Sequence, residues 1–313
     1  MKMMATIIKN SRAWLSNRAT TKLLGFLALA LLLSAIFFRE FWRSLPVMLS
    51  PDWIFGQFHA SPWGILALCL LFLWLKRKVV WAQMNLGTNP AYALLGLVML
   101  ATAILVPFSR DFLVFQVLLA SLGLFTIIFG KGSRFPAICL VIYGLAVSAP
   151  LVIERFFEEA YSRAAITPVI GLLTALGYSF QNQGQWVNFV TSGGGTISVA
   201  ITAACAGPAT MGVFLALFTL MMLDMPLPPR KAVWIFLSGL VGTWFQSFFR
   251  MVFLLLVGYY FGWNALQTAH SWTIYIFFPI WFIIFAYVYL RQVKRPQRPW
   301  DNRQLSGLPA VGE

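Results

Sequence analysis

The residues best suited to chemistry are a cysteine, an arginine and a histidine in the second half of the chain. Cys205 lies in the stretch AACAGPATM, Arg250 in FQSFFRMVFLLL and His270 in QTAHSWTIY. A thiol becomes a good nucleophile when a base or a cation favours the thiolate. A histidine can take that proton and return it to a leaving amine, and an arginine can stabilise a thiolate or an oxyanion. These residue types suffice for acyl transfer through a thioester.

The sequence around these residues supports the same chemistry but leaves one choice open. Gly207 would let a substrate backbone come close, and Pro208 suits the first turn of a helix. Cys205 would then flank a helix N-terminus, whose dipole favours a thiolate. The second histidine, His59 in FGQFHASPWG, is as good a candidate base as His270 on physical grounds alone.

Each of the three residues also has a structural explanation. A buried free cysteine is usually a small core residue, and a lone histidine at a helix start is often a hydrogen-bonded structural residue. An arginine inside a membrane is costly unless it is paired or hydrated, although it can also snorkel to the headgroups. The alternative functions are therefore a transporter or lipid carrier that binds an anionic substrate at Arg250, and a non-catalytic assembly factor, for example of an exopolysaccharide system.

The composition predicts a protein with many membrane spans. Of the 313 residues, 60% are hydrophobic and only 10% are charged, against roughly 25% charged residues in a soluble domain. The three cysteines, Cys69, Cys139 and Cys205, are scattered, which predicts neither a disulfide framework nor a metal site. A zinc site needs at least three protein ligands, so we expect no metal, and no motif indicates a cofactor.

Apolar runs of about 20 residues are long enough to span a bilayer. We therefore predict an all-α membrane protein with about eight transmembrane helices. A shorter apolar segment at 165–177 is interpreted as interfacial or re-entrant. The predicted spans are 21–38, 53–75, 91–108, 112–130, 135–153, 205–223, 232–260 and 271–290.

The basic residues set the orientation, because cytoplasmic loops carry an excess of Lys and Arg. With both termini inside, 17 of the 23 Lys and Arg residues fall on the inner side and 5 on the outer side. The net charge of +14 is therefore a topology signal with some attraction to anionic lipids, and nucleic-acid binding is not expected. We predict a cytoplasmic segment at 1–20, a membrane domain at 21–290 and a disordered cytoplasmic tail at 291–313.

The outer side carries one long polar stretch, residues 154–204. Its second half, QWVNFVTSGGGTISVAI, alternates around a glycine turn and predicts a small extracytoplasmic β-hairpin before the sixth span. Arg250 is 18 residues into the seventh span, roughly 27 Å from its inner end. In a hydrocarbon core of about 30 Å, it therefore shares the outer boundary with Cys205 and His270.

These three motifs, in this order, resemble the exosortase/archaeosortase family of integral-membrane transpeptidases, over roughly residues 154–290. The resemblance implies that Cys205 is the nucleophile, Arg250 the stabiliser and His270, in preference to His59, the acid or base. The family often has serine after the cysteine, where this chain has Ala206, and asparagine three residues before the arginine, where it has Ser247. Gln246 lies on the same helix face as Arg250 and is a candidate replacement for that amide.

The resemblance also implies a substrate, a reaction and a location. Substrates would be exported proteins that end in a Pro-containing motif, one membrane helix and a basic cytoplasmic tail. The enzyme would cut near the motif at the outer face of the cytoplasmic membrane and pass the acyl group to an acceptor. The acceptor, water in a simple protease or a lipid amine in a transpeptidase, is left open.

Overall fold

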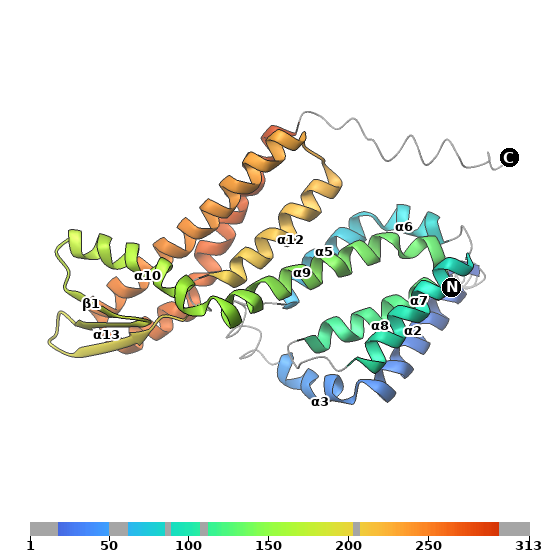
Figure 1. Ribbon diagram of the computed structural model, residues 1–313, viewed down its shortest axis with the longest axis horizontal. Helices are drawn as coiled ribbons and strands as arrows, with labels where there is room; N and C mark the ends of the chain where they lie inside the picture. Colours follow the sequence, from blue (N-terminus) through green and yellow to red (C-terminus); the bar gives the residue numbers. More distant parts are fainter. Residues whose placement is uncertain (1–17, 50–61, 85–88, 107–111, 203–206, 294–313) are drawn as a thin grey trace, which may run out of the picture. The chain divides into compact units, whose positions relative to one another are not determined.

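The computed structural model describes residues 18–49, 62–84, 89–106, 112–202 and 207–293. Within these ranges the chain is mostly helical and carries one small antiparallel sheet (Figure 1). The chain divides into two compact units, residues 1–151 and 152–313. Most of the predicted tail at 291–313 and most of the predicted segment at 1–20 lie outside the described residues, and the first two residues of that tail, Arg291 and Gln292, are helical.

The first unit is a set of apolar helices. Helices α7 and α8 make its closest pairing, because Gly96 and Gly123 face each other and leave no room for side chains between the two backbones. Small residues at a helix contact are typical of membrane proteins. The helices are α2 (Arg18–Phe37), α3 (Arg39–Met48), α5 (Pro62–Leu75), α6 (Arg77–Met84), α7 (Pro90–Leu105), α8 (Leu113–Phe129), the 3-10 turn η3 (Gly130–Ser133) and most of α9 (Arg134–Phe156).

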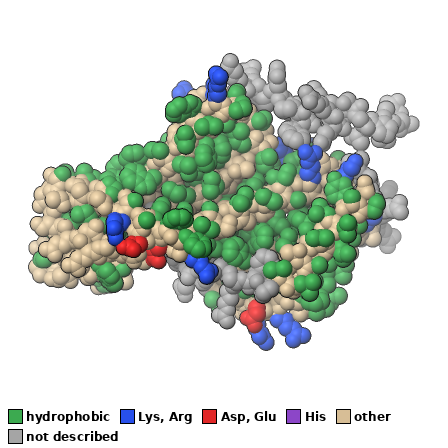
Figure 2. Space-filling model, viewed as in Figure 1, with side chains coloured by type: hydrophobic (Ala, Val, Ile, Leu, Met, Phe, Trp, Pro, Cys, Tyr) green, Lys and Arg blue, Asp and Glu red, His purple; other side chains and the backbone are tan. Residues whose placement is uncertain are grey.

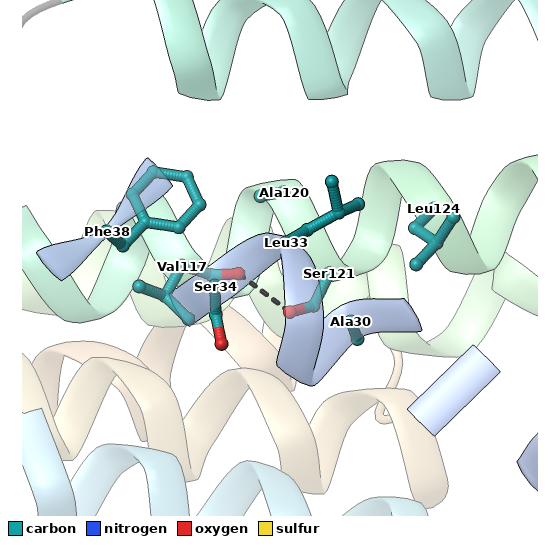
Figure 3. Close-up of a pocket in the computed structure, with 8 residues that line it drawn as sticks. All are labelled: Ala30, Leu33, Ser34, Phe38, Val117, Ala120, Ser121 and Leu124. Atoms are coloured by element: carbon teal, nitrogen blue, oxygen red, sulfur yellow. Dashed lines mark hydrogen bonds between the residues drawn. The ribbon is translucent and has the colours of Figure 1, made fainter. Parts of the chain in front are cut away.

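A small cavity of about 10 Å³ lies between α2 and α8 of this unit. Figure 3 shows that its wall is apolar apart from two serines, and that the hydroxyl of Ser121 donates to the carbonyl of Val117 at 2.8 Å. The hydroxyl of Ser34 is also engaged, since it donates to the carbonyl of Leu31 at 2.8 Å. A cavity of this size holds no more than a water molecule, so it is no candidate for a substrate site.

The second unit combines α10 (Glu158–Ala175) with a three-stranded antiparallel sheet. The strands are β1 (Phe180–Gln183), β2 (Trp186–Val190) and β3 (Thr196–Ala200), in that order. The β2–β3 pair, with Val190 opposite Thr196, confirms the hairpin that alternation and the glycine turn predict. Strand β1 was not predicted. The segment 165–177, interpreted as interfacial or re-entrant, is helical up to Ala175 as part of α10, and α10 packs on this sheet.

Two further helices complete the unit, α12 (Pro208–Asp224) and α13 (Pro229–Gln292). Gly262 interrupts α13 with φ 83° and ψ −173°. The two halves fold back on each other, since Phe253 contacts Phe277 at a ring distance of 6.0 Å and Trp281 Nε1 donates to Thr243 Oγ1 at 3.1 Å. Helix α13 is therefore a helical hairpin, and it corresponds to the predicted seventh and eighth spans.

The end of this hairpin near Gly262 packs against the sheet and α10 (Figure 1). The main-chain N–H of Ser192, in the β2–β3 turn, donates to the carbonyl of Tyr259 at 2.9 Å, which satisfies a carbonyl at the end of the first half of α13. Apolar side chains from all three parts form one core. Its buried members include Ile166, Val169, Leu173, Val187, Phe189, Met251, Leu255 and Leu266.

By length and composition, two described helical stretches can cross a membrane, Leu113–Phe156 and Pro229–Gln292. A third arises if α2 and α3, bent by 97°, form one span. Each of the two long stretches contains two of the predicted spans. The structure thus confirms a mostly helical transmembrane protein with a small sheet, whereas the total of eight spans stays a prediction.

Candidate functional site

The start of α12 has the form that its sequence predicts. Pro208 is the first helical residue, where a missing N–H costs nothing, and Gly207 before it has φ 112°. Only glycine adopts this conformation without strain. Thr210 Oγ1 closes the first turn by donating to the carbonyl of Gly207 at 2.6 Å. Cys205, two residues before Gly207 in the sequence, lies outside the described residues.

Gly207 is also a point of close contact between α12 and α13. A Cβ atom at this position would overlap Ser247 Oγ and lie 3.0 Å from Ser247 Cβ. The absence of a side chain at Gly207 therefore lets Ser247 pack against the backbone at the start of α12. Because Arg250 lies one turn further along α13, this contact brings the arginine's face of the helix to the start of α12.

Arg250 is buried, with 4% of its surface exposed, and is held by the second half of α13. Its Nε donates to Thr273 Oγ1 at 3.2 Å, and its Nη2 donates to the main-chain carbonyl of His270 at 3.4 Å. The hydroxyl of Thr273 in turn donates to the same carbonyl at 3.4 Å. The hairpin therefore brings Arg250 next to the segment that carries His270, and hydrogen bonds from a charged group stabilise that arrangement.

His270 has a half-buried side chain and does not lie at the start of a helix. The prediction that a helix begins near residue 271 is wrong, because the second half of α13 starts directly after Gly262. Hydropathy missed this stretch because its residues include Asn264, Gln267 and Thr268, which are polar but helical. His270 is therefore two turns inside a helix. His59, the other candidate base, lies outside the described residues.

Sequence reasoning did not identify two neighbours of this region. Thr273, which accepts a hydrogen bond from Arg250, is buried and lies one helical turn from His270. A polar residue at that spacing from His270 was the only sign in the sequence that could have identified it as part of the site. Tyr161 of α10 reaches the first turn of α12, where its hydroxyl donates to Met211 Sδ at 3.8 Å. Burial raises the pKa of Tyr161 to about 12, which keeps the phenol protonated.

A larger open groove, with a volume of about 530 Å³, lies among the described residues. It follows one flank of the second half of α13 and includes Thr273, the partner of Arg250. Among the described residues, no group of three His, Cys, Asp or Glu side chains could hold a metal ion. The groove is lined by Phe253, Asn264, Ala265, Thr268, Ala269, Trp272, Thr273 and Ile276.

The surface fits a lipid environment around the helices. Figure 2 shows hydrophobic side chains over much of the helical surface on the face drawn, with few charged side chains among them. Large exposed apolar side chains occur along both halves of α13, for example Trp234, Phe249, Trp272 and Ile283. A soluble protein rarely exposes continuous apolar surface of this kind.

The comparisons with known proteins gave one result. No curated protein matched the chain, and no solved structure matched it. A family model described as transmembrane exosortase (Exosortase_EpsH) matches residues 53–287, about three quarters of the 313 residues. The match includes the positions of Cys205, Arg250 and His270, and the chain therefore belongs to the transmembrane exosortase family.

Proposed function

We propose that this protein is a cysteine transpeptidase that cleaves the C-terminal sorting signals of exported proteins. Membership of the transmembrane exosortase family implies a membrane role in sorting proteins with C-terminal signals, and the family is generally considered to consist of cysteine transpeptidases. The observation that carries the proposal is the position of Arg250. It is buried, bonded to the His270 segment, and on the face of α13 that packs against the start of α12.

The proposed reaction has two steps. The Cys205 thiolate attacks the carbonyl carbon of the scissile peptide, the C–N bond breaks, and His270 gives a proton to the leaving amine. The product of this step is a thioester between Cys205 and the exported protein. An acceptor amine, or water, then attacks the thioester carbon, loses its proton to His270, and releases the thiolate.

Arg250 would stabilise the negative charge that moves through both steps. A buried guanidinium acts over a short distance in a medium of low dielectric constant, where its effect on an oxyanion is larger than in water. The bonds to Thr273 and to the His270 carbonyl hold it in one geometry. Such preorganisation means that little rearrangement is needed when the charge develops.

We place this site at the outer face of the cytoplasmic membrane. Arg250 is 21 residues beyond Pro229, the first residue of α13, which corresponds to roughly 32 Å along a helix. This length matches a hydrocarbon core of about 30 Å if Pro229 lies near the inner surface, as the basic pair Arg230 and Lys231 predicts. A cut just above a membrane helix would fall at that depth.

The test follows an exported reporter that carries a sorting signal from the same cell. With Cys205→Ala the reporter should accumulate uncut, and normal maturation in this variant would refute the mechanism. A transporter or lipid carrier predicts instead that Cys205→Ser is harmless while Arg250→Ala abolishes uptake. A non-catalytic assembly factor predicts no covalent adduct of Cys205 with thiol-reactive probes. The transpeptidase predicts loss of cleavage in both Cys205→Ser and Arg250→Ala.

A further inference from the structure

Two polar residues beside Arg250 have no part in the mechanism above. Gln246 and Ser247 are both buried, with 7% and 4% of their surfaces exposed. Among the described residues, Oε1 of Gln246 has no hydrogen-bond partner. The Ser247 hydroxyl lies against Gly207, and no described residue hydrogen-bonds to it.

Their neighbours on the same helix face have hydrogen-bond partners. Thr243, one turn earlier, donates to the carbonyl of Gly239 at 2.8 Å and accepts from Trp281 Nε1 at 3.1 Å. Arg250, one turn later, bonds to Thr273 and His270. Buried polar groups in native proteins nearly always have partners, and within a membrane there is little water to supply them. An unpaired acceptor next to an unpaired hydroxyl therefore points to a ligand.

We propose that Gln246 and Ser247 bind the main chain of the substrate on the leaving-group side of the scissile bond. Oε1 of Gln246 accepts from a backbone N–H, and the Ser247 hydroxyl donates to a backbone carbonyl. An extended peptide offers both groups. This inference rests on the proposed function, because it takes the substrate to be a polypeptide that is cut beside Arg250.

The depth of the two residues fits this part of the substrate. Gln246 and Ser247 precede Arg250 by four and three residues, which places them roughly 6 and 4.5 Å further into the membrane along the helix. The substrate segment beyond the cut is a membrane helix, and the first four N–H groups of any helix lack partners within it. The side-chain Oε1 of Gln246 supplies an acceptor where those N–H groups lose contact with water.

The experiment compares Gln246→Met and Ser247→Ala with Thr243→Val as the matched control. All three remove polar groups from one face of α13 and largely conserve volume. The rate at which membranes containing each variant cleave the exported reporter is measured alongside the melting temperature of the purified protein. Gln246→Met and Ser247→Ala should each slow cleavage by about tenfold, the effect of one lost hydrogen bond. Their melting temperatures should stay unchanged or rise, because an unpaired polar group is removed.

Thr243→Val should behave in the opposite way, with a lower melting temperature and a wild-type rate of cleavage. Wild-type rates in both Gln246→Met and Ser247→Ala would overturn the inference. A slower rate that is accompanied by a lower melting temperature in both variants would also overturn it, since that result indicates a packing role. Equal cleavage of the reporter by the wild type and by Cys205→Ala would instead refute the proposed function. A failure of this inference can therefore be told apart from a failure of the proposed function.

Discussion

Gly207→Ala tests the close approach of α12 to α13 on which the candidate site depends. Two separate costs are expected from this change. An alanine at φ 112° is strained, which costs about 1–3 kcal/mol. Its Cβ would also overlap Ser247 Oγ and lie 3.0 Å from Ser247 Cβ and 3.2 Å from Thr210 Oγ1, and overpacking of this kind costs about 1–3 kcal/mol. The sum is a loss of about 2–6 kcal/mol in stability.

The chain offers a control for the backbone cost alone. Gly194, in the β2–β3 turn, has φ 86°, and a Cβ there would meet nothing within 4 Å. Gly194→Ala should therefore reduce stability through backbone strain alone, by about 1–3 kcal/mol. The second substitution Ser247→Ala, added to Gly207→Ala, removes the overlapping oxygen and should restore part of the stability.

Denaturation of the purified proteins in detergent measures these differences, and cleavage of the exported reporter shows whether the site survives. Gly207→Ala should be less stable than Gly194→Ala. The interaction energy between Gly207→Ala and Ser247→Ala, obtained from the two single variants and the double variant, should be about 0.5–3 kcal/mol. Equal losses at the two glycines, with no coupling to Ser247, would show that α12 does not approach α13 at this position. The reasoning about the site would then fail as well.

Two further predictions concern the helical hairpin of α13. Arg250→Lys keeps the charge but replaces two separate donor nitrogens, which bond to Thr273 and to the His270 carbonyl, with a single flexible ammonium. We therefore expect a loss of about 1.5–3 kcal/mol in stability and slower cleavage, and wild-type behaviour in both assays would contradict the geometry. In Gly242→Ala the new Cβ would overlap the indole of Trp281. Thermal denaturation should therefore show a loss of about 1–3 kcal/mol in stability. A melting temperature equal to that of the wild type would contradict the close packing of the two halves of α13.

The sequence predicts those features of the fold that depend on local patterns. Alternation around three glycines predicted the β2–β3 hairpin, and Pro208 predicted the first turn of α12, because turn and cap residues act through their own backbone preferences. Strand β1, with the sequence FQNQ, has three exposed polar residues and no alternation. It exists because β2 supplies its hydrogen bonds, a tertiary cause that a local pattern does not contain.

The sequence predicts how far along its helix Arg250 lies, but not which side chains surround it. Counting residues from the start of an apolar segment gives that distance, because it needs only the rise per residue, and the depth of Arg250 in a membrane stays a prediction. Which side chains Arg250 meets depends on how the two halves of α13 turn toward each other. Gly262 and the packing along the hairpin decide that, so Thr273 could not be identified as its partner beforehand. The same limit applies to the contact between Ser247 and Gly207.

The most direct test of the account is the detection of the acyl-enzyme. Purified wild-type protein is mixed with the exported reporter, quenched during cleavage, and examined by intact mass measurement. We predict a species whose mass equals that of the enzyme plus the N-terminal part of the reporter. Hydroxylamine should release the reporter fragment from this species, as it does from a thioester, and the species should be missing in Cys205→Ala. Cleavage of the reporter without this species, or its persistence in Cys205→Ala, would contradict the account.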